Sequence, residues 1–170
     1  AIGCRPSTMI SAPSFRGLGV LVTGHTGFKG AWLSAWLARG GADVTGLALA
    51  PERNGRPNLF EAAGLGGGMR SVIGDIRDFA LVERTLRDAR PEIVFHLAAQ
   101  ALVRRGYADP LGTFATNVMG TAHVLEAARR AGVRAVVCVT SDKCYANAGA
   151  RRPFREDDPL GGRDPHSASK

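Results

Sequence analysis

The sequence predicts an α/β protein in which helices cover both faces of a parallel β-sheet. Short apolar runs alternate with longer stretches in which apolar residues recur at helical spacing. A glycine-rich segment lies between the first apolar run and the first helical stretch. Apolar runs that end in glycines are typical of buried parallel strands, and strands that alternate with helices are joined by right-handed crossovers. The expected fold therefore has three layers, with the sheet in the middle.

The apolar patterns place the individual strands and helices along the chain. In chain order they predict a strand over 19–23, a helix over 31–39, a strand over 44–49, a loop over 51–68 with a short helix near 59–63, a strand over 71–73, a helix over 79–89, a strand over 93–95, a helix over 110–131 and a strand over 135–139. Apolar residues recur at helical spacing in three of these helices. They are Trp32, Leu33, Trp36 and Leu37 in 31–39, Phe79, Val82, Leu86 and Ala89 in 79–89, and Phe114, Val118, Leu125 and Ala128 in 110–131. The four residues of the last helix are expected to be buried.

Length and composition fit one folded domain. The chain has 170 residues, 45% hydrophobic and 22% charged, which is ordinary globular usage and excludes a disordered or fibrous chain. No apolar run approaches the roughly 18 residues of a membrane span, and the N-terminus lacks the apolar core of a secretory signal. Because Cys4, Cys138 and Cys144 cannot pair completely and form no CxxC motif, we expect no disulfide framework and a soluble protein of the reducing cytoplasm. No metal site is expected. Residues 1–17 are expected to be a disordered or extended lead-in to a domain over 18–170.

The excess of positive charge does not point to nucleic acid. The chain carries 22 Lys and Arg against 15 Asp and Glu, for a net charge of +7. Nearly all the cations are Arg, scattered as singles and pairs without interleaved aromatic residues. Aromatic residues make up 6% of the chain, too few for a base-stacking platform. A site for an anionic nucleotide cofactor and substrate explains part of the excess.

A glycine motif marks the first candidate site. Gly24, Gly27 and Gly30 form a GxxGxxG pattern directly between the first strand and the first helix. Glycines let the backbone approach a diphosphate closely, and the start of the helix offers free N–H groups and the positive end of the helix dipole. At a strand–helix junction the pattern therefore predicts a dinucleotide site, with a glycine-rich turn that binds no ligand as the alternative.

With its other motifs, the chain resembles the extended short-chain dehydrogenase/reductase family. These motifs are Gly74-Asp75-Ile76-Arg77 after the third strand, His96-Leu97-Ala98-Ala99-Gln100 after the fourth, Thr116 to Thr121 in the long helix, and Thr140-Ser141-Asp142-Lys143 after the fifth. Within the family, segments 25–30 (HTGFKG), 141–145 (SDKCY) and 158–162 (DPLGG) are most similar to the CDP-glucose 4,6-dehydratases. The resemblance implies a three-layer Rossmann fold with strand order 3-2-1-4-5, truncated before the later strands and the C-terminal substrate domain.

The resemblance also implies an NAD site. It assigns the diphosphate loop to Gly24, Thr26, Gly27, Phe28, Lys29 and Gly30, the adenine to Asp75 and Ile76, the ribose and nicotinamide side to Leu97, Ala98 and Ala99, and the vicinity of the active site to Asn117 and Lys170. An acidic residue after the second strand normally accepts the ribose hydroxyls. Here that strand ends in Leu49-Ala50, and Glu52 follows beside Arg53, which could face a 2′-phosphate. The expectation of NAD over NADP therefore rests on the resemblance alone.

Three consecutive residues carry the expected chemistry. In the family's reaction a hydride passes from sugar C4 to NAD, water is lost across C5–C6, and the hydride returns to C6. This requires a base for the C5 proton and an acid for the C6 hydroxyl on one rigid strand end. The resemblance assigns Lys143 as the base, Asp142 as the acid and Ser141 as the hydrogen-bond partner of the C4 oxygen, with CDP-glucose or a related sugar nucleotide as substrate. The alternative for Asp142 and Lys143 is an exposed ion pair.

One position departs from the family pattern. The family's Tyr-x-x-x-Lys pair aligns with residues 166–170, which places Lys170 at the lysine but His166 at the tyrosine. Imidazole, with an ordinary pKa of about 6.5, can act as a base. By ordinary bond lengths its outer nitrogen falls roughly 2 Å short of a phenol oxygen, and a misplacement of about 1 Å can cost about 100-fold in rate. We therefore expect slow oxidation and an inactive isolated chain.

Two other functions stay open at this point. A C4 epimerase or another nucleotide-sugar dehydratase shares the cofactor-binding half, and a catalytically silent NAD-binding module fits His166. Family members are commonly homodimers, through helices that include 110–131. Because no helix follows to cover the fifth strand, Val136 and Cys138 are expected to be partly uncovered.

Overall fold

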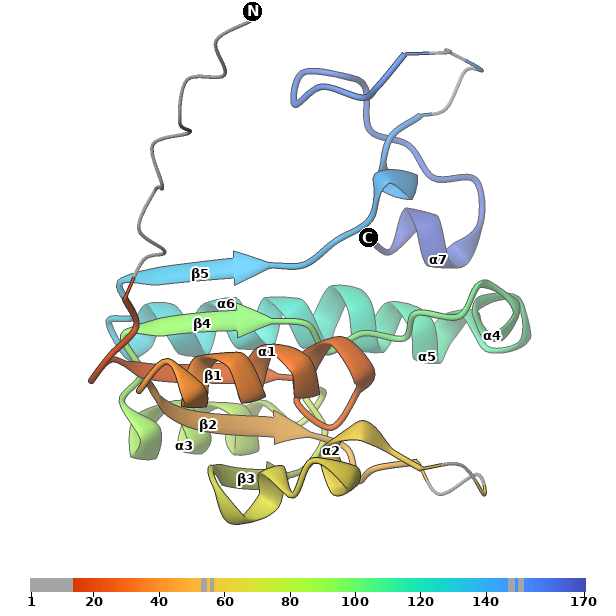
Figure 1. The fold of residues 1–170 in the computed structure, drawn as a ribbon. Helices are drawn as coiled ribbons and strands as arrows, with labels where there is room; N and C mark the ends of the chain where they lie inside the picture. Colours follow the sequence, from red (N-terminus) through yellow and green to blue (C-terminus); the bar gives the residue numbers. More distant parts are fainter. Residues whose placement is uncertain (1–13, 53–54, 56, 147–148, 150–151) are drawn as a thin grey trace, which may run out of the picture.

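The five strands of the sheet run parallel, in the order β3-β2-β1-β4-β5 (Figure 1). The computed structural model describes residues 14–52, 55, 57–146, 149 and 152–170. The central strand β1 pairs with β2 and β4, so that Thr23 lies opposite both Leu47 and His96. The predicted fold and strand order are confirmed. The strands are β1 (Gly19–Thr23), β2 (Asp43–Ala48), β3 (Arg70–Ile73), β4 (Ile93–His96) and β5 (Ala135–Cys138).

Helices lie on both faces of the sheet, with α1 on one face and α3 and α6 on the other (Figure 1). The helices are α1 (Phe28–Arg39), α2 (Leu59–Ala62), α3 (Phe79–Ala89), α4 (Val103–Ala108), α5 (Pro110–Phe114), α6 (Gly120–Arg130) and α7 (Pro165–Ala168), with 3-10 turns η1 (Leu65–Gly67) and η3 (Asp142–Cys144) and a π-helical segment η2 (Ala115–Met119). Each predicted element is present, and α4 is an element that the apolar patterns did not predict.

The alternation of side chains along β1 divides the core into two parts. Val20 and Val22 pack with Leu37 of α1 on one face. Leu21 points to the other face, where it packs with Val82 of α3 and residues of α6. Because successive side chains of a strand point to opposite faces, a run that is apolar throughout must be covered on both sides. The unbroken apolar run of β1 therefore fixes the three-layer arrangement.

The long helix expected over 110–131 is divided into α5, η2 and α6. The expectation that Phe114, Val118 and Leu125 are buried is wrong, since they are 41%, 43% and 44% exposed, whereas Ala128 is buried as expected. The buried face of these segments instead carries Thr113, Asn117, Gly120, Val124 and Ala127, whose side chains are smaller than those of Phe and Leu. Helical spacing of apolar residues identified the helix but not the face that packs closely, because small residues permit the close approach.

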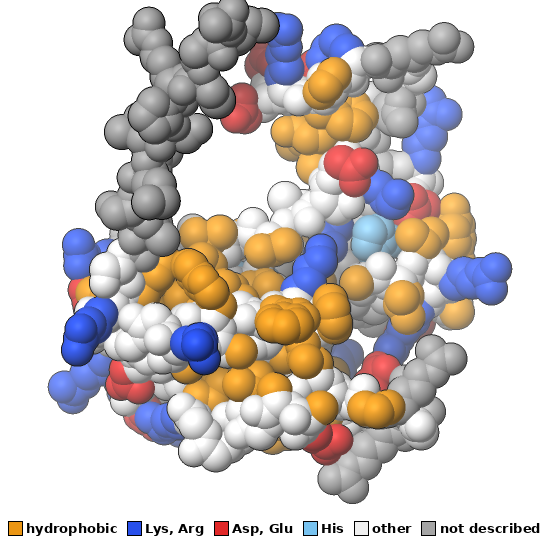
Figure 2. Space-filling view, viewed as in Figure 1, with side chains coloured by type: hydrophobic (Ala, Val, Ile, Leu, Met, Phe, Trp, Pro, Cys, Tyr) orange, Lys and Arg blue, Asp and Glu red, His pale blue; other side chains and the backbone are white. Residues whose placement is uncertain are grey.

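Apolar side chains remain at the surface in two further places. Figure 2 shows hydrophobic side chains gathered over α1, where Trp32 and Trp36 are 57% and 52% exposed. On the edge strand β5, Val136 is half-buried and Cys138 is exposed, as expected, and Val137 is 46% exposed. In the described part of the chain, no helix is long and apolar enough to cross a membrane.

The packed part of the chain begins before the expected boundary at residue 18. The ring of Phe15 lies edge-on to Trp36 and to Phe95, with centroids 5.7 and 6.2 Å apart. The backbone N–H of Gly17 donates to the carbonyl of Gly41 over 2.8 Å. The rest of the expected lead-in, residues 1–13, lies outside the described residues.

Gly46 of β2 should be intolerant of any side chain. A Cβ at this position would collide with the imidazole ring of His25, which is fully buried above it. Overpacking of this kind costs about 1–3 kcal/mol. We expect Gly46→Ala to lower the free energy of unfolding in urea by that amount. Gly67→Ala is the matched control, because a Cβ there meets nothing within 4 Å; equal stability of the two variants would contradict the packing.

Candidate functional site

The glycine loop between β1 and α1 is shaped by close backbone contacts. Gly24 has φ +78°, and a Cβ on it would lie 2.9 Å from the backbone nitrogen of Ala98. A Cβ on Gly30 would collide with the carbonyl of Gly24. Both positions therefore require glycine, the first for its left-handed conformation and its approach to the β4 loop, the second for the tight return of the chain into α1.

The start of α1 has the properties of an anion site. Its N-cap, Gly27, makes no side-chain capping bond, and the first turn contains no acidic residue. Lys29 lies in that turn and is exposed. The first N–H groups of a helix have no partner within the helix, and the helix dipole favours negative charge there. These residues therefore fit a diphosphate, which would accept the free N–H groups and lie beside the Lys29 ammonium.

Side chains of the loop anchor it to the end of β2. Thr26 Oγ1 donates to the carbonyl of Leu49 over 2.9 Å, and Asn58 Nδ2 donates to the carbonyl of Thr26 over 3.2 Å. The ring of His25 lies 2.7 Å from Ser71 Oγ at Nε2 and packs edge-on against Phe60. Burial lowers the pKa of His25 and so favours the neutral ring. The loop is thus tied to the adenosine side of the candidate site.

The residues assigned to the adenine lie after β3. Both carboxylate oxygens of Asp75 accept hydrogen bonds from Arg77, which lowers the pKa of Asp75 and keeps it ionised. Ile76 is buried against Gly120 of α6, where a Cβ would collide with its Cδ1 region. His123 Nδ1 donates to the Ile76 carbonyl over 3.0 Å. Arg77 belongs to the predicted motif after β3, whereas His123 is a positioning partner that the sequence alone did not indicate.

Residues 97–99 follow β4 and lie beside the glycine loop. Thr23 Oγ1 accepts from the backbone N–H groups of Leu97 and Ala98, each over 3.1 Å. The same hydroxyl lies 2.7 Å from Nδ1 of His96. His96 is 4% exposed, and its burial, together with the nearby Lys170 ammonium, lowers its pKa to about 4. The sequence motif included His96, but only its place at the end of a buried strand hinted at a polar role.

Asn117 connects the β4 loop to α7. It lies within the π-helical segment η2, and its Oδ1 accepts from the backbone N–H of Gln100 over 2.8 Å. Its Nδ2 donates to the Gln100 carbonyl over 3.0 Å and to Ser169 Oγ over 2.8 Å. π-Helical turns often mark functional sites. The predicted residue Asn117 therefore connects the loop after β4 to the end of α7 through hydrogen bonds.

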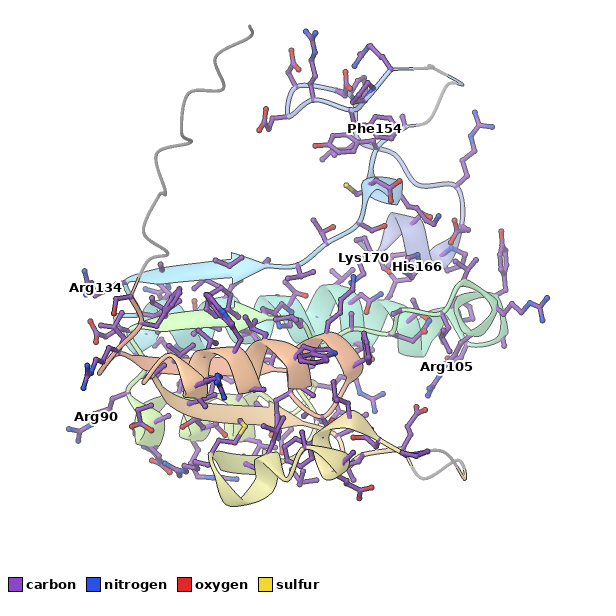
Figure 3. All side chains as sticks on the ribbon, in the orientation of Figure 1. Arg90, Arg105, Arg134, Phe154, His166 and Lys170 are labelled. Carbon is purple, nitrogen blue, oxygen red and sulfur yellow. The ribbon has the colours of Figure 1, made fainter. Side chains whose placement is uncertain are left out.

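His166 and Lys170 lie on and just after α7, which is placed beyond the carboxyl ends of the strands (Figure 3). His166 is 5% exposed, and its Nδ1 has no hydrogen-bond partner among the described residues. Burial, followed by the effect of the Lys29 ammonium, lowers the pKa of Lys170. Lys170 therefore lies within electrostatic reach of both the glycine loop and His96.

Asp142 and Lys143 begin η3, and Ser141 is its N-cap, separated from the end of β5 by two residues. Ser141 Oγ accepts from the backbone N–H of Lys143 and donates to Asp142, each over 3.2 Å. Asp142 and Lys143 are both exposed, but the structure records no ion pair between them. They therefore do not form the exposed ion pair that was the alternative to a catalytic role. They border a cavity of about 290 Å³. Its other lining residues are Tyr145, Phe154, Gly161, Gly162, Arg163, Asp164 and Ser167.

The cavity is built from the segment between η3 and α7. Tyr145 and Phe154 stack with ring centroids 4.9 Å apart and form an aromatic wall that the sequence did not indicate. Gly162 packs against the backbone of Ser167 in α7, where a Cβ would collide. Asp164 caps α7 by accepting from the N–H of Ser167 over 3.1 Å. Among the described residues, no group of three or more His, Cys, Asp or Glu side chains could hold a metal ion.

The predicted site residues of the glycine loop and of the segments after β3, β4 and β5 thus follow the carboxyl ends of parallel strands, which lie at the same end of the sheet (Figure 1). Asn117 lies in η2, and His166 and Lys170 lie on and just after α7. Residues 21–170 match the family model described as GDP-mannose 4,6 dehydratase. The chain belongs to this family. The family is part of the extended short-chain dehydrogenases/reductases, which confirms the resemblance drawn from the motifs.

Relatives of this GDP-mannose 4,6 dehydratase family member include dehydratases and epimerases. CDP-glucose 4,6-dehydratase of Salmonella typhimurium is 52% identical over 164 residues, which are 95% of this chain and 45% of the relative. UDP-glucose 4-epimerase of Mycolicibacterium smegmatis is 37% identical, over 88% of this chain and 47% of the relative. The structure of UDP-glucose-4-epimerase from Stenotrophomonas maltophila with bound NAD and formylated UDP-arabinopyranose matches with a TM-score of 0.77 and 27% identity, over 90% of this chain and 45% of that one. The chain spans about half the length of these relatives.

The lowered pKa of His96 makes folding stability depend on pH. In the unfolded chain His96 titrates near 6.5, and in the folded chain near 4, so the unfolded state binds more protons between these values. Stability from His96 is complete above about pH 6.5 and is lost as the pH falls toward 4, by about 3 kcal/mol at 1.36 kcal/mol per pKa unit. We expect urea unfolding at pH 7, 5 and 4 to show this loss and His96→Gln to lack it. Parallel pH profiles for both proteins would contradict the burial of a neutral ring.

Proposed function

We propose that the chain is the cofactor-binding part of an NAD-dependent nucleotide-sugar 4,6-dehydratase that acts on CDP-glucose. The observation that carries the proposal is the placement of Ser141, Asp142 and Lys143 beyond β5, at the sheet edge that also carries the glycine loop. The 52% identity to a CDP-glucose 4,6-dehydratase supports this substrate over the other sugar nucleotides. A cytoplasmic location belongs to the same proposal.

The residues that would bind NAD are those of the described edge. The diphosphate would lie on the N–H groups at the start of α1, beside Lys29. Asp75 and Ile76 would contact the adenine, and Leu97, Ala98 and Ala99 would face the ribose and nicotinamide. NAD, when bound, would supply the acceptor and donor of the hydride that leaves C4 and returns to C6. Leu49 and Ala50 stand where a ribose-binding carboxylate is usual, so no residue distinguishes NAD from NADP. The preference for NAD therefore rests on family likeness.

The chain's own residues would move the protons. His166, supported by Lys170, would accept the proton of the C4 hydroxyl while Ser141 holds the C4 oxygen. Lys143 would take the proton from C5, and Asp142 would give a proton to the C6 hydroxyl, so that one water leaves across C5–C6. When the hydride returns to C6, the protonated Lys143 would give this proton back to C5. Bound substrate would cover Lys143, whose side chain is exposed in the free chain. Removal of water around an ammonium favours its neutral form, which a base requires.

His166 sets the rate of the first proton transfer. Its ring is buried on α7, and an imidazole is shorter than a phenol, so its outer nitrogen would fall short of the position of a tyrosine oxygen. We propose that oxidation at C4 is therefore slow with His166 in this position. The same observation favours a second candidate function, an NAD-binding module that has lost catalysis.

We also propose that the protein associates as a homodimer through the outer face of α5, η2 and α6. Leu111, Phe114 and Val118 on this face are 85%, 41% and 43% exposed, and Met119 and Leu125 extend the strip. Contiguous exposed apolar surface of this kind is typical of protein–protein interfaces.

NAD binding can be tested on the chain itself by titration calorimetry. We expect NAD to bind, and Gly24→Ala to weaken binding about tenfold, because left-handed backbone strain of about 1–2 kcal/mol acts at the diphosphate loop. Gly67→Ala should bind like the parent chain. Absence of NAD binding by the folded parent chain, or equal affinity of Gly24→Ala, would contradict the assignment.

Catalysis can be tested in a chimera in which the chain replaces the matching half of the Salmonella typhimurium CDP-glucose 4,6-dehydratase. With NAD and CDP-glucose, we expect a product lighter by one water, and His166→Tyr should raise the rate about 100-fold. In the His166→Tyr background, Lys143→Met should abolish the product, whereas Arg84→Met, on the exposed surface of α3, should not.

The outcomes separate the candidate functions. A product of unchanged mass would show epimerisation instead of dehydration. NAD binding without turnover in the His166→Tyr chimera would overturn the dehydratase and leave the silent module.

A further inference from the structure

The hydroxyl of Thr23 has a fixed role in the buried polar layer under the site. Its oxygen accepts two hydrogen bonds, from the N–H groups of Leu97 and Ala98, each over 3.1 Å. A hydroxyl has two acceptor positions and one proton. With both acceptor positions filled, the proton of Thr23 can only be donated to the third neighbour, Nδ1 of His96, 2.7 Å away. Nδ1 of His96 is therefore an acceptor and carries no proton.

The second nitrogen of His96 then has a fixed role too. A neutral imidazole without a proton on Nδ1 carries it on Nε2. Nε2 accordingly donates to Thr121 Oγ1 over 2.9 Å, and the Thr121 hydroxyl donates to the backbone carbonyl of Asn117 over 2.6 Å. Every bond in the row from Thr23 to Asn117 points in one direction. A proton added to Nδ1 would break the bond to Thr23.

The row connects the two sides of the candidate site. Thr23 holds the loop that follows β4, whereas Asn117 holds Gln100 and, through Ser169, the end of α7 next to Lys170. Thr23, His96, Asn117 and Ser169 are all at most 6% exposed. Buried networks whose members are all satisfied are rigid and define a single arrangement.

We propose that His96 is a positioning residue that carries its proton on Nε2. In this tautomer it holds the loop after β4, and the contact between η2 and α7, in the arrangement that receives the nicotinamide end of the cofactor. The inference rests on the proposed function, because the loop and Lys170 are assigned to NAD through it. The ammonium group of Lys170, just after α7, is the nearby charge that opposes protonation of the His96 ring. His96 itself touches neither cofactor nor substrate in this proposal.

The tautomer can be tested without any ligand. Long-range nitrogen–proton NMR of the 15N-labelled chain distinguishes protonated from unprotonated imidazole nitrogens, and His96→Gln identifies the His96 signals. We expect His96 to keep its proton on Nε2 between pH 8 and pH 5, with no titration in that range. A proton on Nδ1, or a titration near pH 6.5, would overturn the proposal.

The positioning role is tested through Thr121. Thr121→Val keeps the shape of the side chain but removes the hydroxyl, which leaves Nε2 of His96 unpaired. A buried polar group without a partner is unfavourable by an amount that corresponds to about tenfold in affinity, so NAD binding should weaken about tenfold. Thr121→Ser keeps the hydroxyl and should restore the parent affinity. Thr85→Val is the matched control: Thr85 is 3% exposed and its hydroxyl donates to Leu81, outside the row.

The results divide clearly. Thr85→Val should lower the melting temperature without changing NAD affinity, so a loss of affinity in that variant as well would reduce the role of His96 to general stability. Equal NAD affinity of Thr121→Val and Thr121→Ser would overturn the positioning role. If the folded parent chain binds no NAD, the proposed function fails, and the NMR result alone then supports or overturns the tautomer.

Discussion

The candidate site depends on one buried hydroxyl, that of Thr23, which joins the ends of two neighbouring strands. It receives the first two N–H groups after β4, from residues more than 70 positions away in the chain. Gly24 follows directly, and its lack of a Cβ lets the glycine loop pack against Ala98. The glycine loop and the loop after β4 are thereby held together by direct contacts, although they come from different crossovers of the fold.

The two halves of the proposed chemistry differ in how firmly they are held. The residues on the cofactor side are buried and joined by hydrogen bonds from Thr23 through Asn117 to Ser169. Asp142 and Lys143, by contrast, are exposed at the rim of an open cavity. Hydride transfer tolerates little misplacement, so a preorganised cofactor side is the physical requirement. The acid and base for elimination can acquire their environment when a sugar nucleotide covers them.

Much of this arrangement was accessible from the sequence. The unbroken apolar run of β1, the glycines after it and the alternation of strands and helices predicted the parallel sheet and a dinucleotide site after β1, whereas the strand order was implied by the family resemblance. The packing face of α5, η2 and α6 was not predictable, because Phe114 and Leu125 make a stronger apolar pattern than the smaller residues that pack. The connections of His96, Thr121 and Ser169 were not predictable either, since they join residues far apart whose hydroxyl and ring orientations depend on the tertiary fold.

The pair of His25 and Gly46 has a consequence for the evolution and engineering of the adenosine side. The ring of His25 occupies the space that a side chain on β2 would otherwise fill. This part of the core is therefore filled by the loop rather than by the strand. A smaller residue at position 25 would open a void that a larger residue at position 46 could fill, so the two positions are expected to covary. Exchange of the loop alone between relatives would therefore replace only one of two side chains that must fit each other.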